Sequence, residues 1–197
     1  MTDTLSIRAA LSADMQEIEQ TLLLGFATDP LFRFLWPKAS SYLSIAEGFT
    51  MTGRASVHGG HAKIAGDFSG VCLWLPPGVK ADEDAFAAFF DGTSLTPTQI
   101  NDITENHEAL ARCKPIEPFW YLSLLAIDPA CQNLGIGSAL MKHTLRELDE
   151  INALTYLVSS NPRNLSFYRS HGFKQVTTIK TGCMPEMFPM LRQPKNG

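Results

Sequence analysis

The chain has 197 residues, of which 45% are hydrophobic and 18% are charged, a composition typical of globular proteins. This length predicts a single domain over residues 1–197 that is large enough to bury a core. The 16 Lys and Arg residues are scattered among 20 Asp and Glu residues, and the formal net charge is −4. This balance argues against a nonspecific nucleic-acid site and against a polybasic membrane patch.

Targeting and metal signals are weak. Residues 1–14 lack the basic segment and the long apolar core of a signal peptide, and no apolar stretch approaches the roughly 20 residues that span a bilayer. The four cysteines are far apart and form no CxxC pair, which is typical of reduced thiols in the cytosol. We therefore expect a cytoplasmic protein that binds neither a membrane nor nucleic acid. His58 and His61 have no Cys or carboxylate partner nearby in the sequence, so we expect no metal.

The first half of the chain predicts helices around a pair of strands. A strand is expected over 5–10, a helix from Met15 to Phe26, a helix over 41–58, and paired strands over 61–65 and 70–75. Between the two helices, residues 29–37 are aromatic, with Pro30 and Pro37 near their ends. We expect this segment to be a loop that lines a pocket or covers the core.

The second half alternates helices and strands. Helices are expected over 82–90, over 97–113 with Thr96 as the cap, from Ile136 onwards, and over 162–170 with Asn161 as the cap. Strands are expected over 119–127, 154–159, 173–180 and 184–191. The last of these could be a dimer edge or an internal strand. The order of elements predicts a mixed α/β fold.

A glycine-rich loop is the most informative segment. Gln132-Asn133-Leu134-Gly135-Ile136-Gly137 lies between an apolar strand and an amphipathic helix. Glycines at this spacing allow backbone N–H groups to approach a ligand, and the helix adds the positive end of its dipole. The arrangement suits an anion, most naturally a pyrophosphate. Rossmann and P-loop motifs fit poorly, because there is no GxGxxG and Ser138 stands where a P-loop has lysine.

Residues 119–173 resemble the cofactor-binding half of the GCN5-related N-acetyltransferase (GNAT) superfamily. The strand ending in Ala126-Ile127-Asp128-Pro129 resembles the fourth strand of that fold, Gln132 to Gly137 resemble its Q/R-x-x-G-x-G/A loop, and Asn161 to Phe173 resemble its Asn…Tyr…Gly-Phe segment. Three further segments are similar to the puromycin-acetyltransferase-like branch: Asp29-Pro30…Trp36-Pro37, Trp74-Leu75-Pro76-Pro77-Gly78 and Pro185…Pro189-Met190-Leu191-Arg192.

The resemblance implies a central twisted mixed sheet of six to seven strands, flanked by helices, whose fourth and fifth strands are parallel and splay apart. It also implies transfer of an acetyl group from acetyl-CoA to a primary amine of a small molecule, by direct attack in a ternary complex. The implied cofactor contacts are Leu125, Ala126 and Ile127 for the pantetheine amides, and Gln132, Asn133, Leu134, Gly135, Ile136, Gly137 and Ser138 for the pyrophosphate.

Three assignments accompany this resemblance. Tyr168 is the expected general acid, because a phenol can protonate the departing CoA thiolate. Asn161 has the spacing to Tyr168 seen in much of the superfamily, and Asn164 has that of the puromycin-like branch, so both are candidate cofactor contacts. No general base is assigned, because the fifth strand, residues 155–159, contains no carboxylate.

Two other functions remain open at this stage. A protein or peptide N-acetyltransferase would suit the net negative charge, and a noncatalytic acetyl-CoA sensor would suit a site without a base. Whether the acyl group is acetyl or longer, and whether the protein is a monomer or a homodimer, does not follow from the sequence.

Overall fold

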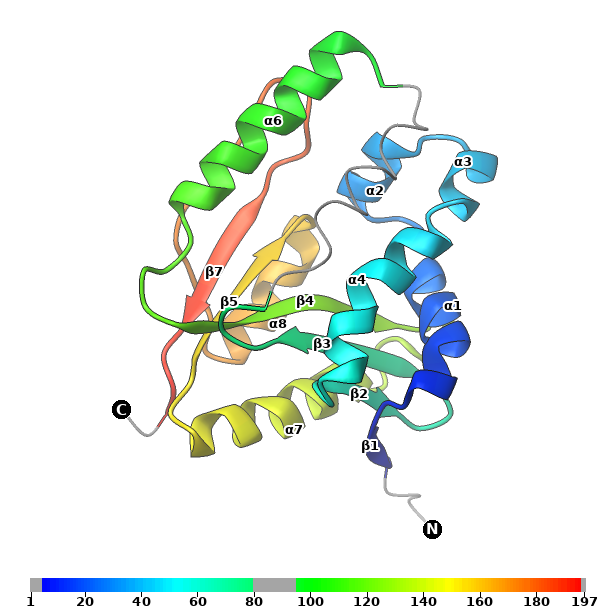
Figure 1. The fold of residues 1–197 in the computed structure, drawn as a ribbon, viewed down its shortest axis with the longest axis vertical. Coiled ribbons are helices and arrows are strands. Elements are labelled where there is room, and N and C mark those ends of the chain that lie inside the picture. Colours follow the sequence, from blue (N-terminus) through cyan, green and yellow to red (C-terminus); the bar gives the residue numbers. More distant parts are fainter. Residues whose placement is uncertain (1–4, 80–94, 196–197) are drawn as a thin grey trace.

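A computed structural model describes residues 5–79 and 95–195, and the helix expected over 82–90 lies outside these ranges. The described strands form one mixed sheet of seven strands in the order β1-β2-β3-β4-β5-β7-β6 (Figure 1). They are β1 (Ile7–Ala9), β2 (Ala62–Ala65), β3 (Gly70–Leu75), β4 (Phe119–Ile127), β5 (Leu154–Ser159), β6 (Lys174–Gln175) and β7 (Phe188–Arg192). The predicted mixed α/β fold is therefore confirmed.

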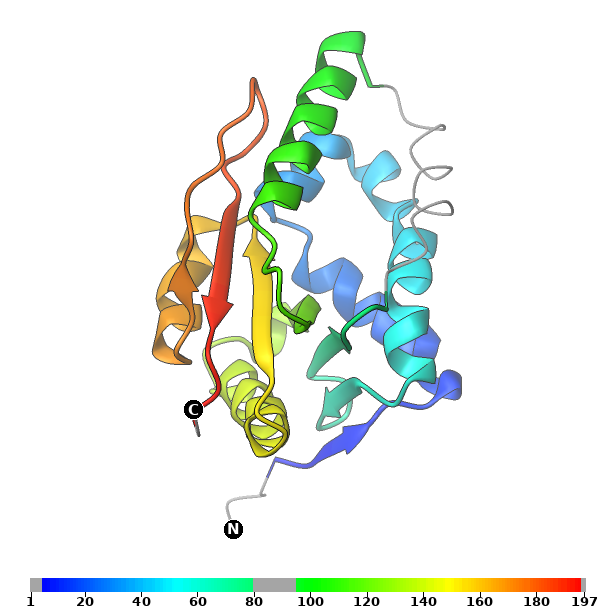
Figure 2. The same cartoon turned by 60° about the vertical axis from the view of Figure 1, so that its left-hand side comes forward.

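Helices cover both faces of this sheet (Figure 2). They are α1 (Met15–Gly25), α2 (Pro30–Leu35), α3 (Ala39–Leu43), α4 (Ala46–His58), α6 (Pro97–Arg112), α7 (Ile136–Glu150) and α8 (Leu165–Ser170). On one face, α1 and α4 bury residues such as Ile18 and Phe49 against β2 and β3. On the other, α7 and α8 bury Leu140 and Tyr168 against β3 and β5. The two hydrophobic clusters hold the sheet between the two helical layers.

The fourth strand changes partner along its length. β4 pairs antiparallel with β3 along most of its length, and the register shifts between Leu73 and Trp74 so that Ser123 of β4 is an extra residue, a β-bulge. Its parallel pairing with β5 ends at Leu122, opposite Leu157, although β4 continues to Ile127. Figure 1 shows the two strands diverging beyond this point. The predicted parallel, splayed pair of strands is confirmed.

The C-terminal strand is internal. β7 pairs antiparallel with β5 on one side and with β6 on the other, so it is no free edge. The strand expected over 173–180 is shorter than predicted, because only Lys174 and Gln175 are in the ladder and Ile179 makes one isolated bridge to Met187.

Two predictions for the N-terminal half were wrong. Residues 29–37 contain a helix, α2, because the Asp29 side chain caps it and Pro30 occupies its first position, where a missing N–H costs nothing. The helix expected over 41–58 is two helices, α3 and α4. At the break, Ser44 Oγ donates to the Ser41 carbonyl at 2.7 Å, a local bond that competes with helical pairing.

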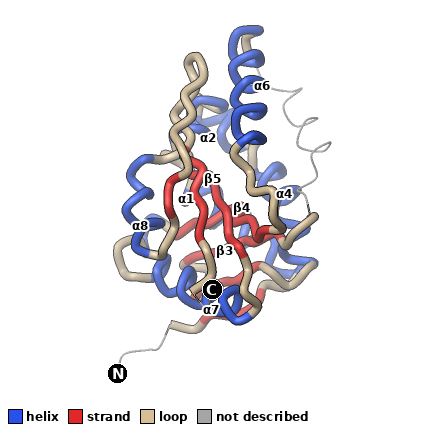
Figure 3. Tube along the Cα trace, turned by 90° about the vertical axis from the view of Figure 1, so that its left-hand side faces the viewer, coloured by secondary structure: helices blue, strands red, loops and turns tan. Residues whose placement is uncertain are grey.

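The long helix α6 stands beside the loop between β6 and β7 (Figure 3). The predicted Thr96 cap is present, as a capping box with Gln99. Asp102 of α6 accepts hydrogen bonds from the backbone N–H of Cys183 at 3.0 Å and from its thiol at 2.9 Å. A Cβ atom at Gly182 would come within 2.3 Å of the same carboxylate, so the loop closes on the helix without room for a side chain.

The C-terminal strand is tied to α7 by an ion pair. Both terminal nitrogens of Arg192, which is buried, donate to Asp149, at 2.8 and 2.7 Å. These bonds hold the pKa of Asp149 below its usual range, so the stability they contribute is present at neutral pH and is lost as the pH falls through that lowered pKa.

We expect Asp149→Ala to lower the free energy of unfolding by about 3–5 kcal/mol, because it leaves the Arg192 guanidinium buried without a counter-charge. Urea unfolding at pH 7 measures this. Glu150→Ala, at the exposed neighbouring position, is the control and is expected to change stability by less than about 0.5 kcal/mol. An equal loss of unfolding free energy in the two variants would contradict the role of Asp149 as the counter-charge of Arg192.

Candidate active site

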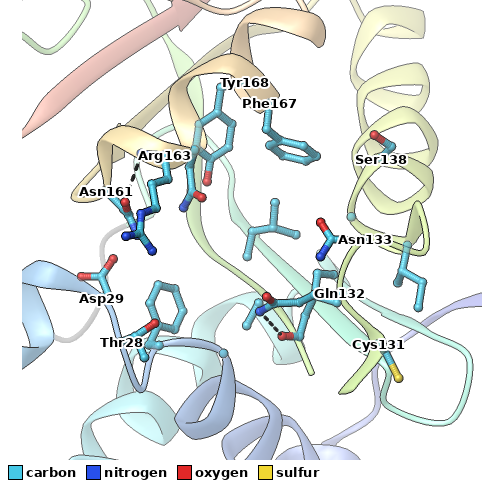
Figure 4. A pocket seen from close by; sticks show the side chains of 18 of the residues that line it. Thr28, Asp29, Cys131, Gln132, Asn133, Ser138, Asn161, Arg163, Phe167 and Tyr168 are labelled. Carbon is cyan, nitrogen blue, oxygen red and sulfur yellow. Dashed lines mark hydrogen bonds between the residues drawn. The ribbon is translucent and has the colours of Figure 1, made fainter. Parts of the chain in front are cut away.

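A cavity of about 700 Å³ opens where β4 leaves β5 (Figure 4). Its walls come from the end of β4, the glycine-rich loop, the first turn of α7, the start of α8 and the segment after α1. Twelve of the thirteen predicted site residues line it: Leu125, Ala126, Ile127, Gln132, Asn133, Gly135, Ile136, Gly137, Ser138, Asn161, Asn164 and Tyr168. Leu134 does not, and its side chain is 71% exposed.

The glycine-rich loop turns its backbone toward the cavity. Asn133 and Gly135 have positive φ angles of 63° and 80°, conformations that Asn and Gly adopt more readily than other residues. Gly135 directly precedes α7, whose first-turn N–H groups at Ile136, Gly137 and Ser138 have no partner within the helix. The free N–H groups and the positive end of the helix dipole would both favour an anion at this cavity wall.

The two candidate asparagines have different surroundings. The Asn161 side chain accepts a hydrogen bond from the Arg163 N–H at 3.1 Å and caps the turn Pro162–Asn164. Asn164 is exposed and lines both this cavity and a second one. The geometry therefore gives Asn161 a structural role that Asn164 lacks.

One basic side chain lies at the cavity wall. Among the described Lys and Arg residues, only Arg163 lines this cavity, although Lys142, Arg146 and Arg169 lie on the neighbouring helices. Lys142 and Arg146 line a separate pocket on the far half of α7, beside Asp149, and Arg169 donates to Gln175 at 2.9 Å. A phosphate in the main cavity would therefore find Arg163 as its nearest basic side chain among the residues described.

A second cavity, of about 560 Å³, adjoins the first. It runs along β4 and β5 beneath α6. The two cavities share Phe26, Asp29, Leu125, Asn164 and Tyr168. A molecule in one cavity can therefore meet a molecule in the other at these five residues.

Asp29 is a carboxylate at this junction that the sequence analysis did not assign to the site. It is 6% exposed. One of its oxygens accepts from the backbone N–H of Leu31 at 2.9 Å, and the other accepts from Ser160 Oγ at 2.7 Å. Burial raises the pKa of Asp29, and the Ser160 hydrogen bond opposes that rise. A buried carboxylate with a raised pKa in a cavity wall suits proton transfer.

The ring of Tyr168 packs in the core and its hydroxyl faces the cavity. The ring makes edge contacts with Phe167 and Phe173, at centroid distances of 5.3 and 6.1 Å. Figure 4 shows the hydroxyl directed into the cavity. Burial raises the pKa of Tyr168, so the phenol stays protonated at neutral pH and can donate its proton.

The described residues contain no group of three or more His, Cys, Asp or Glu side chains placed to hold a metal ion. No helix within residues 5–79 and 95–195 combines the length and the apolar character needed to cross a membrane.

Residues 101–175 match the family model described as the acetyltransferase (GNAT) domain. That span contains β4, its bulge, the glycine-rich loop, α7, β5 and α8. This match supports the GNAT superfamily for the chain. Its enzyme class is accordingly that of the N-acetyltransferases, and the resemblance stated from the sequence is confirmed at this level. The finer resemblance to the puromycin-like branch stays a prediction.

Solved structures share the GNAT fold over nearly the whole chain. A Corynebacterium glutamicum structure described as histone acetyltransferase HPA2 and related acetyltransferase is 21% identical, with a TM-score of 0.73 and 97% of each chain covered. Arylalkylamine N-acetyltransferase 2 from Aedes aegypti is 10% identical, with a TM-score of 0.70, over 98% of this chain and 100% of that one. The Drosophila melanogaster polyamine N-acetyltransferase is 12% identical, with a TM-score of 0.66, over 96% and 100%.

We expect Gly135→Asp to abolish coenzyme A binding, because a carboxylate at a φ of 80° places negative charge beside the anion site. Titration calorimetry with acetyl-CoA measures this. Gly60→Asp is the matched control, because Gly60 has a φ of 75°, open space around it and no part in the cavity, so it carries the same backbone strain. Micromolar affinity retained in Gly135→Asp would show that the loop does not hold the pyrophosphate.

Proposed function

We propose that the protein transfers an acetyl group from acetyl-CoA to a primary amine of a small molecule, by direct attack in a ternary complex. The observation that carries this proposal is the junction of the two cavities. One cavity suits the donor, the other suits an acceptor, and a buried carboxylate and a phenol lie where they meet.

The residues of the first cavity fit coenzyme A. The N–H groups of Ile136, Gly137 and Ser138 would hold the pyrophosphate, with Arg163 as a nearby cation. Beyond Leu122 the edge of β4 that faces β5 is unpaired, so the backbone of residues 124–127 can accept the pantetheine amides as an added strand. Bound there, acetyl-CoA supplies an activated thioester carbonyl.

Asp29 is the proposed general base. An alkylammonium must lose a proton before its nitrogen can attack, and Asp29 lies in the wall shared by the two cavities. The nitrogen then forms an amide bond as the carbon–sulfur bond of the thioester breaks. Backbone N–H groups of β4 near the bulge at Ser123 can stabilise negative charge on the carbonyl oxygen. Tyr168 would give its proton to the departing thiolate, and the second proton that the attacking nitrogen loses as it becomes an amide would restore the phenol.

Structural neighbours support a range of amine acceptors. They include N-acetyltransferases named for agmatine, arylalkylamines, polyamines and a ribosomal-protein alanine. A small-molecule acceptor is favoured here because the volume of the second cavity, about 560 Å³, is in the range of small-molecule sites. A protein or peptide acceptor is the alternative. Asp29 weakens the case for a noncatalytic sensor, which rested on the missing base. The cytoplasmic location and a monomeric or homodimeric state stay predictions.

The function is tested first by calorimetry with acetyl-CoA, with NAD and ATP as controls. Selective binding of acetyl-CoA, followed by release of free thiol when primary amines are added, supports the proposal. Turnover of peptides alone would favour the protein-acceptor alternative. Tight acetyl-CoA binding without turnover of any amine or peptide would overturn the enzymatic assignment.

We expect Tyr168→Phe to lower kcat by about 10²-fold or more, with little change in the affinity for acetyl-CoA, because only the proton donor is removed. Single-turnover measurement of acetyl transfer, in which product release does not limit the rate, checks this. Phe173→Leu is the control for packing. It alters a different aromatic residue of the same hydrophobic cluster, one that lines neither cavity. An unaltered single-turnover rate in Tyr168→Phe would remove the phenol from the mechanism.

We expect Asp29→Asn to lower kcat/KM by about 10²–10⁴-fold, because asparagine keeps the cap of α2 but cannot accept the proton. In the unmodified protein, kcat/KM should rise with pH as Asp29 loses its proton, with a midpoint above the ordinary aspartate pKa. Ser160→Ala removes a hydrogen bond that lowers the pKa of Asp29, so this midpoint should move to higher pH. A midpoint that does not move in Ser160→Ala would contradict Asp29 as the titrating base.

A further inference from the structure

We infer that the acceptor carries one ammonium group on an uncharged, aromatic body, and that Lys114 excludes acceptors with a second positive charge. This inference rests on the proposed function and narrows its substrate class. It comes from the distribution of charge and of aromatic rings along the second cavity.

The second cavity has a reacting end and a distant end. Asp29, Leu125 and Tyr168 also line the cofactor cavity, so they mark the reacting end. Phe119 begins β4 and lines the second cavity only. Leu125 lies six positions after Phe119, which is about 20 Å of strand. Lys114 lies five positions before Phe119 in the chain and, like Phe119, lines the second cavity but not the first, so we assign it to the distant end.

The charges at the two ends are opposite. Among the described residues that line this cavity, Asp29 is the only carboxylate, and Lys114 and His107 are the basic side chains. The ammonium of an acceptor therefore has one favourable partner, at the reacting end. A diamine or polyamine would place its second ammonium toward Lys114, where no described carboxylate compensates it. Electrostatic repulsion of this kind gives specificity by weakening the binding of competing ligands, rather than by strengthening the binding of the correct one.

The walls between these ends are apolar and aromatic. Phe26 and Phe32 lie near Asp29, with their ring centroids 4.9 Å apart. Farther along, Tyr156 contacts Phe119 at 5.4 Å with an interplanar angle of 68°, and Tyr121 at 6.0 Å. An aromatic acceptor would find edge and face contacts with these rings, which are worth about 0.5–1.5 kcal/mol beyond the burial of apolar area. A flexible, hydrated polyamine would lose its water without gaining such contacts.

The first test compares three primary amines with the same protein: 2-phenylethylamine, 2-cyclohexylethylamine and 1,12-diaminododecane, a diamine long enough to carry its second ammonium toward the distant end. We expect kcat/KM to be at least tenfold higher for 2-phenylethylamine than for the diamine, with the cyclohexyl amine between them. A diamine that is acetylated as well as the aromatic amine, or better, would overturn the inference while leaving the proposed function intact.

Binding is measured separately from turnover, by titrating each amine into the protein saturated with coenzyme A. This measurement decides the inference even if no amine is acetylated, in which case only the proposed function fails. Tighter binding of 2-phenylethylamine than of 1,12-diaminododecane supports the inference, and equal or reversed affinities overturn it.

The second test is Lys114→Glu, which places a second carboxylate at the distant end of the cavity. Because Lys114 is exposed, this variant should fold normally. We expect the ratio of kcat/KM for the diamine to that for the aromatic amine to rise at least tenfold, and the corresponding affinity ratio to rise with it. Lys174→Glu is the matched control, an exposed lysine of β6 that does not line this cavity, and should leave both ratios unchanged. Ratios unchanged in Lys114→Glu would overturn the role of Lys114.

Discussion

The separation of β4 from β5 is the constraint on which the rest of the site depends. Paired strands of a sheet satisfy each other's backbone groups and leave no space between them. Here the parallel pairing stops at Leu122, one residue before the bulge at Ser123, while β4 continues along β3. Both cavities border the part of β4 beyond this point, so the same interruption provides room for two molecules and a strand edge for one of them to pair with.

The helices bring the reactive groups to this gap. A Cβ atom at Gly25 would lie 2.7 Å from Ala126 Cβ, so the end of α1 approaches β4 as closely as glycine allows. The chain then turns and places Asp29 at the junction, where a single carboxylate both caps α2 and accepts a hydrogen bond from Ser160. From the opposite layer, α8 contributes Tyr168. The proposed proton acceptor and the proposed proton donor thus come from chain segments more than a hundred residues apart.

The glycine-rich loop could be interpreted from the sequence because its function is local. Its glycine spacing, the strand before it and the helix after it all lie within residues 119–150, and the φ angles of Asn133 and Gly135 are those that their residue types favour. The proposed base could not be found in this way. Asp29-Pro30 was a visible signal for a helix start, but the aromatic residues that follow were interpreted as a loop. Only the packing of α1 on β4 places that cap beside a strand end far along the chain.

The sequence by itself determined the superfamily, the mixed α/β class, the bounds of the strands at residues 119–127 and 154–159 and the tight turn of the glycine-rich loop, because each depends on motifs, periodicity or backbone preference over a short stretch. The tertiary structure alone decided that Asp29 and Tyr168 line the same two cavities, that Asn161 is occupied as a cap while Asn164 lines both cavities, and that Lys114 lines the second cavity. These relations join residues far apart in the chain, and local preferences carry no information about which distant segments the packing of a core brings together.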